Sequence, residues 1–191
     1  MKREHFTNVR YFLVVGLLAT LTMDVTALLI VKTGLIQLGP YRIVPDVLGR
    51  WIACFLEGRF THATILETPS VPNEKLVGLV AHYLIGLTLT SLLLFPHRIW
   101  RRGISLRAGG LFGLATCVFP WFLMFPAMGF GIMGLDLPYP SPLMPFSTLN
   151  HVAFGLVIFF WSNLIPVSRW CFTKHCEESL GKAARPEVAT S

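Results

Sequence analysis

The chain has 191 residues, 53% of them hydrophobic and 14% charged, and its formal net charge is +6 at pH 7. Soluble domains average roughly a quarter charged residues, so this composition has too little polar material to cover a soluble globule. The basic residues flank the apolar stretches, and no basic stretch carries interleaved aromatic residues on a soluble scaffold, which argues against nucleic acid as a partner. The lipid bilayer is therefore the expected surrounding of the chain.

Four apolar stretches approach the ~20 residues needed to cross a hydrocarbon core of ~30 Å. They lie at residues 11–31, 76–95, 109–129 and 147–166. The sequence therefore predicts an all-α fold, a polytopic membrane protein built as a four-transmembrane-helix bundle. We expect one membrane domain over residues 1–176 and a disordered cytoplasmic tail over residues 177–191.

A cleaved signal peptide is the alternative interpretation of the first stretch. Lys2 and Arg3 precede it, and Val25-Thr26-Ala27 resembles a cleavage site. Asp24 would lie just before that cut, and the apolar run continues beyond it. These two features favour a retained helix.

The first loop predicts a further helix outside the bundle. Between residues 44 and 60 the apolar side chains recur at helical spacing, and Pro45 and Asp46 provide a helix start. We expect an amphipathic helix on the outer membrane surface, between the first two spans. Asp46 and Arg50 are four residues apart, so a local ion pair between them is expected.

Prolines shape the second half of the chain. Pro120 and Pro126 interrupt the third stretch and predict a kink there. The third loop, residues 134–146, contains four prolines, so we expect no regular helix in it but a stiff external lid.

The distribution of basic residues predicts the orientation in the membrane. Lys and Arg number three before the first stretch, four in the second loop and four in the tail, against five in the long first loop and none in the third. The termini and the second loop together have eleven Lys and Arg residues, and the first and third loops have five. The positive-inside rule therefore places both termini and the second loop in the cytoplasm.

Three ionisable residues lie inside the predicted spans, namely Asp24, His82 and His151. Each belongs to a stripe of small and polar residues at three- and four-residue steps, the spacing at which membrane helices pack closely. From the helical rise, Asp24 lies about 10 Å, His82 about 9 Å and His151 about 6 Å below the outer surface. We therefore predict an intramembrane polar site at this level, with Thr20, Glu57, His62 and Asn150 as candidate neighbours.

This set of side chains admits several chemical interpretations. One carboxylate and two imidazoles suit a metal ion, so the three residues are candidate metal ligands. They also suit a proton relay, because His titrates near neutrality. Two intramembrane histidines as axial haem ligands are the least favoured alternative. The remaining interpretation is that Asp24 pairs with one histidine and holds the bundle in register.

Several short segments resemble an uncharacterised family of bacterial four-pass inner-membrane proteins, domain of unknown function 2938. The resemblance covers about residues 20–165 and implies a bacterial inner-membrane location, but no activity, cofactor or catalytic residue. The segments are MD at 23–24, GRW at 49–51, GRFTH at 58–62, PSVPNEK at 69–75, AHYLIG at 81–86, FPAMGFGI at 125–132 and NHVAFG at 150–155.

Two functional hypotheses follow. In the first, the chain is a small structural or accessory membrane protein. In the second, it binds a metal or conducts protons or a solute through the Asp24, His82 and His151 level. No nucleophile elbow, phosphate-binding loop or HExxH motif is present, so no reaction is predicted. A homo-oligomer and a partner in a membrane complex both stay open.

Overall fold

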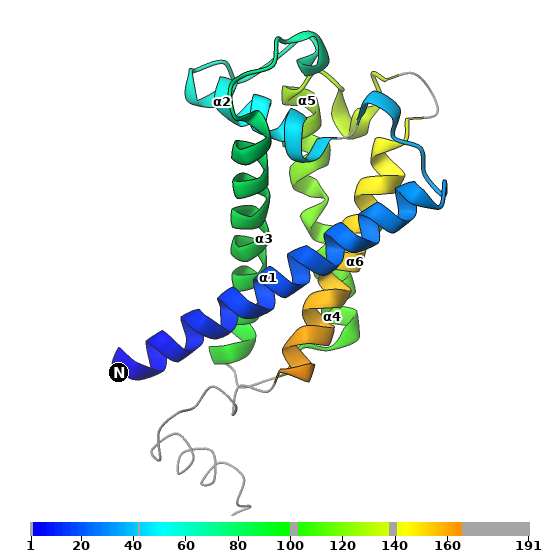
Figure 1. Cartoon of the computed structure of the whole chain (residues 1–191). Helices are drawn as coiled ribbons and strands as arrows, with labels where there is room; N and C mark the ends of the chain where they lie inside the picture. Colours follow the sequence, from blue (N-terminus) through cyan, green and yellow to red (C-terminus); the bar gives the residue numbers. More distant parts are fainter. Residues whose placement is uncertain (1, 42, 100–102, 138–140, 166–191) are drawn as a thin grey trace, which may run out of the picture.

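The computed structural model describes residues 2–41, 43–99, 103–137 and 141–165 (Figure 1). Its long helices are α1 (Lys2–Lys32), α3 (Glu74–Ile99), α4 (Leu106–Thr116) and α6 (Leu143–Leu164), and its shorter ones are α2 (Leu48–Leu56) and α5 (Phe125–Ala127). One-turn helical segments lie at Gly39–Tyr41, Ile43–Val47, Ile65–Glu67, Pro120–Met124 and Ile132–Gly134. The described part of the chain contains no strand, which confirms the all-α prediction.

Four segments are long and apolar enough to cross a membrane: Val9–Lys32, Glu74–Pro96, Leu106–Ala127 and Leu143–Leu164. They overlap the four predicted stretches and confirm the four-span architecture. The N-terminal end of α1, the ends of α3 and α6, and the start of α4 gather at one end of the bundle (Figure 1). The predicted tail lies outside the described residues.

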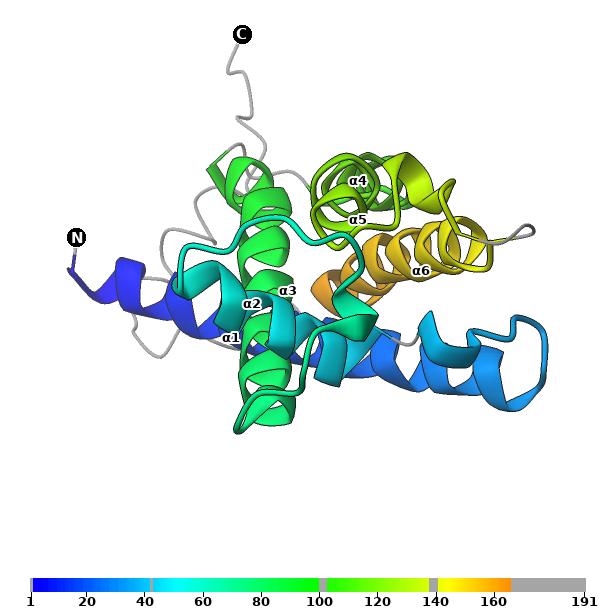
Figure 2. The ribbon, with the colours of Figure 1, turned by 90° about the horizontal axis from the view of Figure 1, so that it is seen from above.

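Helix α1 crosses α3 and α6 obliquely, whereas α4 runs beside α6 (Figures 1 and 2). Small residues lie at the closest contacts. A Cβ on Gly86 would overlap Thr20 Oγ1, and a Cβ on Gly155 would overlap the Gly109 carbonyl oxygen. In a membrane, where apolar side chains gain nothing by leaving lipid, such close backbone packing is a main source of helix association.

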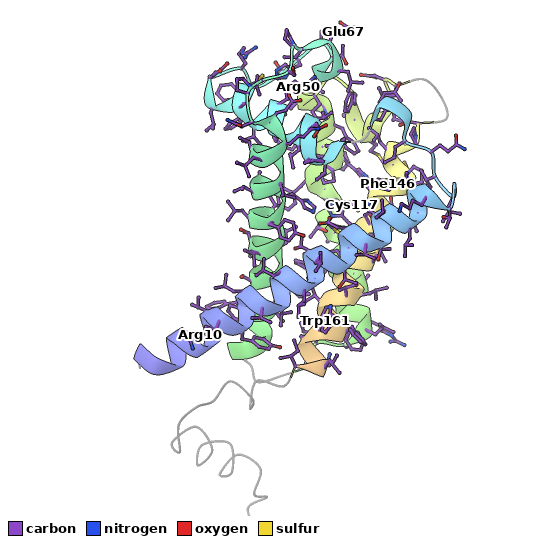
Figure 3. All side chains as sticks on the ribbon, viewed as in Figure 1. Arg10, Arg50, Glu67, Cys117, Phe146 and Trp161 are labelled. Carbon is purple, nitrogen blue, oxygen red and sulfur yellow. The ribbon has the colours of Figure 1, made fainter. Side chains whose placement is uncertain are left out.

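Polar contacts fasten α1 to α6 near the end of the bundle opposite the first loop. Trp161 lies near that end of α6 (Figure 3), and its indole Nε1–H donates to Thr22 Oγ1 over 3.1 Å. The Tyr11 hydroxyl donates to the Ser162 carbonyl oxygen over 3.0 Å. The indole N–H of Trp161 and the hydroxyl of Tyr11 thereby each have a hydrogen-bond acceptor inside the bundle.

The third span is interrupted where the prolines predict it. Helix α4 ends at Thr116, and a wide helical turn over Pro120–Met124 leads into α5. Proline has no N–H to continue the regular ladder, which explains the change of helical geometry.

The prediction that the third loop lacks helix up to residue 146 is wrong at its end. Helix α6 begins at Leu143, with Pro142 as its N-cap and Pro145 in its first turn. The first turn of a helix has no intrahelical partners for its N–H groups, so proline is tolerated there. Pro138 and Pro140 lie outside the described residues.

The first and third loops together form a cap over one end of the bundle, comprising the described residues of 33–73 and 128–142. Backbone contacts join the first loop to the end of α5 and to the third loop: His62 N–H donates to the Ala127 carbonyl over 3.0 Å, and Ile65 N–H donates to the Met128 carbonyl over 2.9 Å. Their shared apolar core includes Leu38, Val47, Leu48, Ile65, Phe125, Met128, Phe130 and Leu143. The predicted amphipathic helix is confirmed as α2, and it packs against α3.

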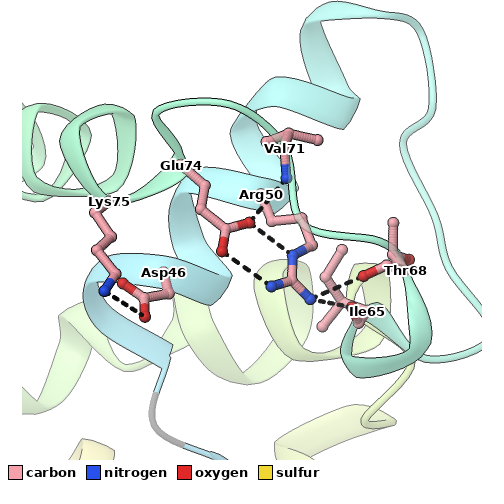
Figure 4. Close-up of polar contacts among 7 residues, drawn as sticks. All are labelled: Asp46, Arg50, Ile65, Thr68, Val71, Glu74 and Lys75. Atoms are coloured by element: carbon pink, nitrogen blue, oxygen red, sulfur yellow. Dashed lines mark hydrogen bonds and ion pairs between the residues drawn. The ribbon is translucent and has the colours of Figure 1, made fainter.

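Arg50 fastens α2 to the start of α3 (Figure 4). Its Nε donates to Glu74 Oε2 over 2.9 Å and its Nη2 donates to Glu74 Oε1 over 3.1 Å. Its Nη1 donates to the Thr68 carbonyl over 2.9 Å, so one guanidinium joins three segments of the cap. The hydrogen bonds to Glu74 raise the pKa of Arg50 above its ordinary value.

The expected ion pair between Asp46 and Arg50 is therefore wrong. Arg50 instead makes a two-point contact with Glu74, and Asp46 lies 4.0 Å from Lys75 Nζ. A carboxylate that accepts both donors of the guanidinium fork is a better partner than a single exposed contact along one helix.

Replacing Arg50 with Ala is expected to destabilise the cap. The Arg50 and Glu74 side chains are only 14% and 13% exposed, so the remaining carboxylate would keep the Val71 N–H as a partner but lose both guanidinium donors, at a cost of about 2 kcal/mol. Thermal unfolding in detergent measures the effect. The matched control is Arg59→Ala, whose ion pair with Glu57 is exposed and whose loss should leave the unfolding midpoint unchanged. Equal midpoints for both variants would contradict the proposed role of Arg50.

Candidate functional site

Asp24 and His82 form a hydrogen-bonded pair between α1 and α3. His82 Nε2 lies 2.8 Å from Asp24 Oδ1, and the Tyr83 hydroxyl donates to Asp24 Oδ2 over 3.1 Å. The carboxylate is an acceptor at both oxygens, so His82 uses Nε2 as its donor here. Both Asp24 oxygens are thus paired with groups from a single neighbouring helix.

Helix packing brings these groups together. One turn from Asp24 on α1 lies Thr20, which is fully buried and donates its hydroxyl to the Gly16 carbonyl over 2.9 Å. One turn from His82 on α3 lies Gly86, which leaves no room for a Cβ beside Thr20. The close crossing at Thr20 and Gly86 sets the distance at which Asp24 and His82 meet.

His151 makes a separate contact between α6 and α4. Its Nδ1 lies 2.8 Å from Thr116 Oγ1, and the Thr116 hydroxyl donates to the Gly113 carbonyl over 2.7 Å. A hydroxyl has one proton, and that proton is directed to Gly113, so His151 donates from Nδ1 to the hydroxyl oxygen. The third predicted site residue is therefore bonded to a group that the sequence analysis did not select.

The two pairs are separate contacts: Asp24 bonds to His82, and His151 bonds to Thr116. Among the described residues, no three His, Cys, Asp or Glu side chains lie close enough together to hold a metal ion. The three ionisable side chains predicted to share one site therefore make two separate contacts. Asp24 and His82 join α1 to α3, and His151 joins α6 to α4.

The remaining candidate neighbours lie in different surroundings. Asn150 is 8% exposed, and its Oδ1 is buried without a hydrogen-bond partner. Glu57 lies on the surface of the cap and pairs with Arg59. The His62 ring contacts the Ala127 carbonyl through Nδ1 over 3.4 Å, within the cap. Of these three residues, Asn150 alone belongs to a membrane span.

Tyr83 and Thr116 are the site residues that sequence reasoning missed. Tyr83 directly follows His82, and Thr116 lies three residues after Gly113 in the third span. Both are polar side chains in predicted spans. A search for every hydrogen-bonding group at the height of Asp24, without restriction to ionisable residues, would have included them.

The fold and this site define a multi-pass membrane protein with paired polar side chains inside its helix bundle. A family model described as "Protein of unknown function (DUF2938)" matches residues 13–165. The chain therefore belongs to this family, as its sequence resemblance predicted. No curated protein and no solved structure matches the chain.

A double-mutant cycle of Asp24→Asn and His82→Gln should detect direct coupling between the two residues. Because they share a hydrogen bond within the bundle, we expect a coupling energy of about 1–2 kcal/mol in the free energy of unfolding. Reversible unfolding in mixed micelles provides the measurement. The control cycle combines Asp24→Asn with His151→Gln, whose side chains bond to different partners. A coupling no larger in the first cycle than in the control would contradict the assigned pair.

Proposed function

We propose that this chain is a small structural or accessory membrane protein whose intramembrane polar side chains serve helix packing. One observation carries the proposal: Asp24, His82 and His151 are each hydrogen-bonded to a neighbouring helix. A polar side chain in hydrocarbon is costly unless it has a partner, and pairing between helices both removes that cost and fixes their arrangement. Its biological contribution would then lie in the surfaces that the bundle and cap present.

We further propose a bacterial inner-membrane location with both termini in the cytoplasm. The excess of Lys and Arg in the terminal segments and the second loop supports this orientation. An even number of spans, with the helix ends gathered opposite the cap, is consistent with it. The cap would then face the periplasm.

Cysteine labelling in intact cells tests this orientation. Ser70 in the cap and Ser105 before α4 are both exposed, so each accepts a cysteine without disturbing the core. With the native cysteines replaced by alanine, a membrane-impermeant maleimide should label Ser70→Cys in intact cells and Ser105→Cys only after lysis. The reverse pattern would place the cap in the cytoplasm.

Proton movement is the second candidate function, and one observation favours it. The Asp24 side chain is 36% exposed although it belongs to a membrane span, so it is accessible from outside the protein. Each imidazole makes its hydrogen bond through one nitrogen and has another with which to accept a proton. Asp24, His82 and His151 would then act as successive proton-binding groups.

Reconstitution into vesicles separates the two functions. Purified protein is placed in vesicles that contain a pH-sensitive dye, and a proton gradient is imposed. The structural proposal expects the same dissipation rate as in protein-free vesicles, because paired side chains provide no open path. A faster rate that Asp24→Asn abolishes would overturn that proposal and establish proton movement. A faster rate that Asp24→Asn and His151→Gln leave unchanged would point to non-specific leakage and retain the structural proposal.

A further inference from the structure

An apolar groove lies between α2 and α3, outside the polar site. It has a volume of about 310 Å³ and is lined by Ile52 of α2 and by Leu76, Val77, Val80, Ala81 and Leu84 of α3. Three of the α3 side chains are highly exposed, at 61% for Leu76, 51% for Val80 and 57% for Leu84. All six residues are apolar, so the groove offers no hydrogen-bonding group to a polar ligand.

The groove faces away from the helix bundle. On α3, His82 and Gly86 contact α1, and Gly78, on the same line of residues, contacts Pro45 and Gly49 of the first loop and α2. Val80 and Leu84 lie about half a turn from that line of residues, because successive helical residues are rotated by about 100°. Helix α2 crosses the cap end of α3 (Figures 1 and 2), and its Ile52 forms part of the groove wall.

The length of the groove indicates what it holds. From Leu76 to Leu84 the helical rise is about 12 Å, which is less than half of the ~30 Å hydrocarbon core. An acyl chain of the leaflet on the cap side would enter the same depth of membrane as the groove.

The composition of the groove supports the same occupant. Helix-to-helix contacts in membranes are rich in Gly, Ala, Ser and Thr, which permit close backbone approach. Here the wall is mainly Leu, Val and Ile, with Ala81 as its single small residue. Branched side chains form an uneven apolar surface that suits a flexible hydrocarbon chain better than a second helix.

Charged residues follow directly on the end of α2. Glu57 and Arg59 pair with each other, and their side chains are 60% and 52% exposed. They lie beyond Leu56, one turn after Ile52 of the groove wall. A carboxylate and a guanidinium together match the ammonium and phosphate groups of a zwitterionic phospholipid headgroup.

We propose that the groove between α2 and α3 binds the acyl chain of one zwitterionic phospholipid from the leaflet on the cap side, with its headgroup beside Glu57 and Arg59. The lipid fills the space beneath α2 and joins it to the exposed face of α3. This site is independent of the structural or proton-moving role proposed for the interior of the bundle.

Native mass spectrometry of the delipidated full-length protein, titrated with dioleoyl phosphatidylethanolamine, tests the proposal. Val80→Trp fills the groove with a larger side chain at an exposed position. The expected result is one tightly bound lipid on the unmodified protein and about tenfold weaker binding to Val80→Trp, equivalent to losing about 1.4 kcal/mol. Arg59→Gln should weaken binding by a smaller factor, through the headgroup alone.

Val118→Trp is the matched control, because Val118 is 55% exposed in the third span and does not line the groove. It should bind the lipid as the unmodified protein does. Leu84→Ala removes part of the groove wall without adding volume, so it should also weaken lipid binding. This variant provides the test if Val80→Trp does not fold. Equal lipid binding by all variants would show general lipid contact and overturn the proposal. The proposal would also be overturned if the unmodified protein formed a dimer that Val80→Trp dissociates, since a second copy of the chain would then occupy the groove.

Discussion

The arrangement of the bundle depends on pairing Asp24 with His82 across two membrane spans. A carboxylate inside hydrocarbon requires a partner, and both oxygens of Asp24 find theirs on α3, at His82 and Tyr83. No further acidic or histidine side chain that the structure describes takes part in this contact. His151 is satisfied through Thr116 on another helix. Asp24 and His151 therefore belong to two separate polar contacts, each of which joins one pair of spans.

Helix α3 connects these interior contacts to the cap. Four residues at four-residue spacing lie along one line on its surface: Glu74, Gly78, His82 and Gly86. Glu74 binds Arg50, and Gly78 leaves no room for a Cβ beside the Pro45 carbonyl. His82 and Gly86 contact α1. The first two members of this periodic pattern thus position the cap and the last two position the first span, which explains how a short loop helix takes a defined place on a membrane bundle.

Much of this structure is predictable from the sequence, and the exceptions have physical reasons. The four spans and α2 follow from hydrophobicity and helical spacing, and the meeting of Asp24 and His82 agrees with their similar predicted depth. The partners of Arg50 and His151 do not follow. A pattern along one helix identifies neighbours on that helix, whereas Glu74 and Thr116 come from other elements. The start of α6 at Leu143 does not follow from the presence of prolines alone, because proline is disfavoured in the interior of a helix but tolerated in its first turn.

The four-residue pattern on α3 also determines how α1 and α3 can align during assembly in the membrane. The two helices run antiparallel, so that Thr20 of α1 meets Gly86 of α3 and Asp24 of α1 meets His82 of α3. A slip by one helical turn would preserve a plausible packing of small residues but would place Asp24 opposite Gly86 and His82 opposite Leu28. Both ionisable groups would then lose their partners at once. The glycines permit close approach in several alignments, and the single carboxylate selects one of them.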